Sequence, residues 1–180
     1  MEVIEIYKPY LYSVQYDNED ENEFDRLLQQ WNDLEFVTRF MMENIDYLSD
    51  PKWGKTFEPE DASRQVLNEA DGLENLFYEL CENVEVGTTP DLDSHFKFLE
   101  GKYKYELEYI PMKSYGIVRP SLLRMYAIKL DSNSYLITGG GIKLGDTIQN
   151  SPDLKDHVLQ NIDKVKAWLK QNGISDSNDL

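Results

Sequence analysis

The chain has 180 residues, of which 41% are hydrophobic and 12% aromatic, and its formal net charge at pH 7 is −16. This length and apolar content predict a folded domain with its own core and exclude a wholly disordered chain. The negative charge excludes nonspecific nucleic-acid binding by the surface as a whole. The acidic residues are unevenly placed, since residues 1–95 hold 24 Asp and Glu against 6 Lys and Arg, whereas residues 96–180 hold 10 against 12. For the acidic half we expect mainly solvated helix surface.

The sequence has no run of about 18 apolar residues, and its N-terminus lacks a basic segment followed by an apolar one. We therefore expect a soluble, cytoplasmic protein. The single cysteine, Cys81, excludes an intramolecular disulfide and a cysteine-rich zinc site, and its apolar-periodic surroundings predict a buried thiol. His95 and His157 have no ligand partner at helical spacing, so we expect neither a metal nor a cofactor.

The first half of the chain changes from a strand pattern to a helix pattern. Two runs rich in β-branched and aromatic residues, separated by Pro9, predict a short hairpin or a bent edge strand within residues 3–16. From Phe24 onward, apolar residues recur at helical spacing, which predicts two helices broken near Asn32. Pro59 then can open a third helix.

A second change of pattern follows residues 87–93, which contain Thr-Thr-Pro, and divides the chain into an acidic, mostly helical part (1–95) and a second part (96–180). In the second part, alternation with period 2 predicts successive strands at residues 104–110, 114–118, 122–130 and 134–142. Pro152 is expected to open a final helix. The predicted fold class is α+β, a helical N-terminal part followed by a small antiparallel sheet and a C-terminal helix.

No phosphate-binding loop, dinucleotide fingerprint or hydrolase motif is present. Gly139, Gly140 and Gly141 predict a bend and a close neighbour at the end of the last strand, because no Lys-Ser/Thr pair follows them. On the preceding strand, period 2 places Arg124 and Tyr126 on one face. Such a pair can clamp a phosphate and stack a base, or it can be an arginine lying over a sheet edge beside a half-buried tyrosine. Spacing alone favours the second interpretation.

The order of motifs in the C-terminal part is distinctive. Arg124-Met125-Tyr126 is followed by a short polar turn, an apolar strand that ends in glycine and Lys143, and a Thr-Ile-Gln-Asn-Ser-Pro link into a helix. This order resembles the RelE/HigB-like toxins of bacterial toxin–antitoxin modules, particularly their phage-derived HigB-like branch. Tyr105-Glu106-Leu107-Glu108 is similar to the Glu-Leu-Arg strand of that family. The resemblance covers roughly residues 96–170.

This resemblance implies a RelE/ParE-like fold and a toxin that inhibits translation, by metal-independent cleavage of mRNA on the ribosome. It implies that Arg124 binds phosphate, that Lys143 is the cation of a basic turn, and that Tyr126 is a stacking residue, so these three are the expected catalytic residues. The implied partner is a helix-turn-helix antitoxin, with no DNA or membrane binding by this chain itself.

A second hypothesis is a non-catalytic module that keeps the toxin-like fold and binds a protein through its acidic half. The charge asymmetry also suggests that the acidic helices fold over the basic sheet, or that they form a docking arm for another protein.

Overall fold

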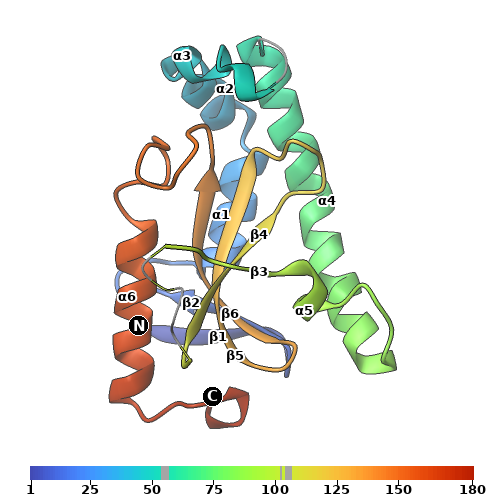
Figure 1. Ribbon diagram of the computed structural model, residues 1–180, viewed down its shortest axis with the longest axis vertical. Coiled ribbons are helices and arrows are strands. Elements are labelled where there is room, and N and C mark those ends of the chain that lie inside the picture. The colour runs from blue at the N-terminus through green and yellow to red at the C-terminus, as the bar shows by residue number, and fades with distance from the viewer. Residues whose placement is uncertain (54–56, 102, 104–106) are drawn as a thin grey trace.

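The computed structural model describes residues 1–53, 57–101, 103 and 107–180, and it has an α+β fold (Figure 1). At its centre is a mixed six-stranded sheet with the strand order β1-β2-β6-β5-β4-β3. Neighbouring strands are antiparallel except β2 and β6, which run parallel. The strands are β1 (Glu2–Tyr7), β2 (Leu11–Gln15), β3 (Lys97–Phe98), β4 (Ile110–Tyr115), β5 (Leu123–Asp131) and β6 (Ser134–Ile142).

The helices begin and end where the sequence supplies caps. Asn22 and Asp33 accept backbone N–H groups at the starts of the first two helices, Pro59 begins the longest one, and Gly87 ends it in the left-handed conformation. The α-helices are α1 (Glu23–Asn32), α2 (Leu34–Glu43), α3 (Ile45–Leu48), α4 (Pro59–Val86), α5 (Leu92–His95) and α6 (Val158–Gln171). Short 3-10 helices are formed by Pro51–Trp53 and Ser177–Asp179. The predicted break near Asn32 and the predicted start at Pro59 are confirmed. No helix in the described ranges is long and apolar enough to cross a membrane.

The sheet separates two helical layers. On β5, Leu123, Met125 and Ala127 belong to the core cluster that contains α1, α2 and α4, whereas Tyr126 and Ile128 pack against the side that carries α6 (Figure 1). The alternation predicted from period 2 is therefore confirmed on this strand. The acidic helices pack on the sheet, as one of the two expectations for them has it, but they cover the face opposite to Tyr126.

The N-terminal hairpin is confirmed, and it joins the main sheet through the parallel pairing of β2 with β6. The largest core cluster contains residues from both sides of residue 95, among them Phe24, Phe77, Met125 and Ile137. The sheet and the core thus continue across the predicted boundary. The division of the chain into parts 1–95 and 96–180 stays a prediction.

Three element boundaries differ from those predicted. Of the strand predicted at 104–110, residues 104–106 lie outside the described residues and residues 107–109 are not in a strand. β4 covers Ile110–Tyr115 in place of a strand at 114–118. The chain turns after Tyr115 because the Gly116 N–H donates to Ser121 Oγ (2.8 Å) across the turn. The final helix begins at Val158 rather than at Pro152, because the preceding segment is held on the sheet by Asp153, whose carboxylate accepts the N–H of Ile142 (2.7 Å).

The three glycines form part of β6 and are packed on both sides. A Cβ on Gly140 would lie 2.5 Å from the carbonyl oxygen of Arg124 and 2.8 Å from Leu27, and a Cβ on Gly141 would lie 2.6 Å from Asp153 Oδ2. The predicted close approach is confirmed. The predicted bend takes the form of a register shift, in which Tyr126 pairs with Gly139 and the next residue of β5 with Ile137. Glycine is required here because neighbouring elements occupy the space of a side chain.

Candidate functional site

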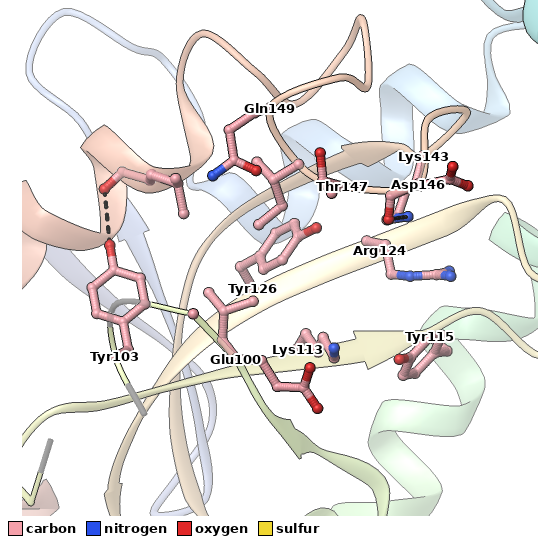
Figure 2. A pocket seen from close by; sticks show the side chains of 14 residues that line it. Glu100, Tyr103, Lys113, Tyr115, Arg124, Tyr126, Lys143, Asp146, Thr147 and Gln149 are labelled. Atoms are coloured by element: carbon pink, nitrogen blue, oxygen red, sulfur yellow. Dashed lines mark hydrogen bonds between the residues drawn. The ribbon is translucent and has the colours of Figure 1, made fainter. Parts of the chain in front are cut away.

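A pocket of about 470 Å³ lies on the face of the sheet that carries α6, between β4, β5 and the loop after β6 (Figure 2). We call it the cation pocket, because Lys113, Arg124 and Lys143 line it. All three residues predicted to be catalytic, Arg124, Tyr126 and Lys143, contribute to its wall. The remaining lining residues are Leu99, Glu100, Gly101, Tyr103, Tyr115, Asp146, Thr147, Ile148, Gln149 and Leu159.

Arg124 is fixed in one orientation by its neighbours. Its guanidinium carbon lies 4.1 Å from the ring centroid of Tyr115, the residue paired with it on β4. Its Nη1 donates to the carbonyl oxygens of Ser121 (3.1 Å) and Leu123 (2.6 Å) and to Ser121 Oγ (3.1 Å). Within the described ranges, every hydrogen bond of the Arg124 guanidinium is donated by Nη1. The N–H groups of Nε and Nη2 therefore remain free to bind a ligand. Burial lowers the pKa of Arg124, yet an arginine stays charged at neutral pH.

Glu69 on α4 supports this arrangement from the opposite side of the sheet. Its side chain is fully buried and accepts hydrogen bonds from Ser121 Oγ (2.7 Å) and from the N–H of Leu122 (3.0 Å). The same serine hydroxyl contacts Arg124, so Glu69 positions the turn that orients the guanidinium. No pattern in the sequence indicates this role, because a glutamate in a long acidic helix is expected at the surface.

Lys143 follows β6 and closes one end of the cation pocket. Its Nζ donates to the carbonyl oxygens of Gly145 (2.7 Å) and Asp146 (2.6 Å), which holds the loop around it. Burial, with smaller contributions from the positive charges of Arg124 and Lys52, lowers the pKa of Lys143 to about 8. An ammonium with this pKa gives up its proton much more readily than an ordinary lysine.

Tyr126 lies at the base of the cation pocket. Its side chain is only 1% exposed and packs among the apolar residues Leu154, Val158 and Ile162. Figure 2 shows its hydroxyl group directed toward the interior of the pocket. The expected stacking of a base on Tyr126 does not fit this burial, because neighbouring side chains cover the ring. The ring of Tyr115, which already carries Arg124, is the more open aromatic surface.

Lys113 is a site residue that the sequence did not indicate. It lies on β4 directly opposite Tyr126, and its Nζ is 5.9 Å from the ring centroid of Tyr115. The predicted strand at 114–118 began one residue too late to include it. Correct placement of β4 would have put Lys113 and Tyr115 on one face by period 2.

The cation pocket is suited to an anion. Against its three cations stand two carboxylates, and one of them, Asp146, is paired with Lys52 at 3.1 Å. The cations come from three separate backbone segments and surround a volume typical of small-ligand sites. A phosphate group is the biological anion that best matches a fixed guanidinium beside two lysines.

Two other side chains of a reactive type, His95 and Cys81, do not line the cation pocket. His95 packs against Phe77 and Phe96, and burial lowers its pKa to about 4. The Cys81 thiol is fully buried, as predicted, and burial raises its pKa to about 12. The described residues contain no group of three or more His, Cys, Asp and Glu side chains placed to hold a metal ion.

Comparison of the chain with protein-family models, with curated proteins and with solved structures finds no match.

Proposed function

We propose that the cation pocket binds the phosphodiester backbone of RNA, and that the chain is the toxin of a toxin–antitoxin module that inhibits translation by cleaving mRNA on the ribosome. The observation that carries this proposal is the convergence of Lys113, Arg124 and Lys143 on one pocket of a protein whose net charge is −16. The RelE/HigB-like order of motifs supports it. The expected partner is a helix-turn-helix antitoxin.

Electrostatics favour the approach of RNA from this side of the molecule. Residues 23–86, whose helices lie on the far face of the sheet, hold 16 of the 34 acidic side chains, and none of these lines the pocket. A nucleotide in the pocket has its phosphate at the end formed by Arg124 and the two lysines. Gln149 lies across the pocket from Arg124 (Figure 2), and the base extends toward it.

The chemistry that these side chains support is transesterification within RNA. The 2′-oxygen attacks the adjacent phosphorus, the bond from phosphorus to the 5′-oxygen breaks, and the products are a 2′,3′-cyclic phosphate and a free 5′-hydroxyl. Arg124 and Lys113 stabilise the charge that develops on the non-bridging oxygens. Lys143 donates the proton that the leaving 5′-oxygen requires, and the proton of the 2′-hydroxyl passes to Glu100, the pocket carboxylate that Lys52 does not pair with.

Induced expression of the full chain in a bacterium is expected to stop growth and to fragment mRNA. The fragments should end in 2′,3′-cyclic phosphate and begin with 5′-hydroxyl, as mapped by end-specific ligation and sequencing, and EDTA should not block cleavage on purified ribosomes. Unchanged growth together with intact mRNA would reject the nuclease and leave the non-catalytic, protein-binding alternative.

The lowered pKa of Lys143 predicts a specific pH dependence. The protonated donor predominates below its pKa of about 8, so cleavage by the wild type should fall as the pH rises from 7 to 9.5. Lys143→Arg keeps the charge but removes the titration, and should therefore have a lower rate without this alkaline decline. Single-turnover rates on a short RNA bound to ribosomes measure both profiles. The same decline in both proteins would exclude Lys143 as the proton donor.

A further inference from the structure

An apolar stripe runs along the outer side of α2 and continues into α3. Leu34, Met42 and Ile45 are exposed to 61%, 64% and 51%, although each is a large aliphatic side chain. Leu34, Thr38 and Met42 are spaced four residues apart and so share one face of α2, and Ile45 follows at the start of α3. The adjoining side of α2 already contributes Val37 and Met41 to the core. The stripe therefore has no partner within the described part of the chain.

The surface beside this stripe is negatively charged. A shallow groove on α2 is lined by Leu34, Glu35, Thr38, Arg39, Met42 and Glu43. Residues 33–50 contain five acidic side chains and one basic one, and Arg39 approaches Glu35 no closer than 3.9 Å. The same charge makes a second copy a poor occupant, because two such surfaces, each from the half with 24 acidic and 6 basic residues, would repel each other.

We propose that the α2 stripe docks an amphipathic helix from another protein, with aliphatic side chains on one face and Lys or Arg along its edges. Aliphatic residues of the partner cover Leu34, Met42 and Ile45, and the flexible Met42 adapts to their shape. The basic edges meet Glu35, Glu43 and their acidic neighbours, which accelerates encounter and fixes the orientation. This surface lies on the opposite side of the sheet from the cation pocket, and the proposal does not depend on RNA binding.

The test uses the full-length protein and a synthetic helical peptide of about 18 residues, with leucines on one face and lysines along both edges. Isothermal titration should give micromolar binding, and amide chemical shifts should change mainly along α2 and α3. The double variant Leu34→Ser/Met42→Gln should weaken binding about tenfold or more. Val86→Ser provides the matched control, because Val86 is also 71% exposed and lies beside Glu82 and Glu85, yet it is remote in sequence from the stripe.

Two further peptides separate this docking from simple charge attraction. Replacing the lysines by glutamates should abolish binding, and scrambling the leucines at constant charge should weaken it as much as the double variant does. Equal binding of the scrambled peptide, or equal loss in Val86→Ser, would overturn the proposal. A wild-type dimer in light scattering that the double variant converts to a monomer would overturn it in favour of self-association.

Discussion

Arg124→Ala is expected to abolish growth inhibition and to lower the rate of RNA cleavage by about 100-fold or more, because it removes the fixed guanidinium that binds the phosphate. The fold should persist, since the side chain lies at the wall of a pocket and its nearest contacts are a ring and a turn. Growth after induction and single-turnover cleavage on ribosomes give the functional result. A thermal melt within about 2 °C of the wild type verifies the fold.

Two companion variants make this experiment specific. Arg64→Ala removes the same charge from an exposed position on α4, where the side chain pairs only with Asp61, and it should remain fully toxic. Arg124→Lys keeps a charge but loses the planar fork, so its activity should lie between those of the wild type and the alanine variant. Full toxicity of a well-folded Arg124→Ala protein would exclude the cation pocket as the catalytic site and favour a non-catalytic module.

The position of Arg124 and Tyr126 on one face was predictable because β5 alternates strictly and its hairpin with β6 is short. These are local features, and period 2 determines which side of a sheet each residue occupies. Lys143 was located by the resemblance and by the glycines before it. The burial that lowers its pKa, and its contact with two carbonyl oxygens, both depend on a loop conformation that no local pattern encodes.

Other parts of the site depend on pairing between distant segments. Glu69 reaches the turn of Ser121 across 52 positions of sequence, and Lys113 faces Tyr126 only once the register of β4 on β5 is known. The parallel pairing of β2 with β6 has the same origin and brings the N-terminal hairpin into the main sheet. A single sequence carries little information on such contacts, because many registers satisfy the same alternation.

Gly140→Ala is expected to lower the free energy of unfolding by about 3 kcal/mol, at the upper end of the usual cost of overpacking. The added methyl group would lie 2.5 Å from the carbonyl oxygen of Arg124, a backbone atom that can move only if β5 moves. It would also press on Leu27 of α1, at 2.8 Å. Urea unfolding followed by fluorescence measures the loss of stability. An unchanged slope of the free energy of unfolding against urea concentration would show that the unfolded state is unaffected.

Gly173→Ala is the informative control for this variant. Gly173 has a φ of +68° after α6, and a Cβ there would meet no atom within 4 Å, so the cost of alanine should be only the backbone strain of about 1 kcal/mol. The two variants should also differ in function. Gly140→Ala displaces the strand that carries Arg124 and should reduce RNA cleavage by more than its stability loss explains, whereas Gly173→Ala should leave the rate unchanged. Equal destabilisation by both variants would mean that β5 and α1 do not constrain Gly140. A wild-type cleavage rate in Gly140→Ala would mean that the packing of β6 on β5 does not set the position of Arg124.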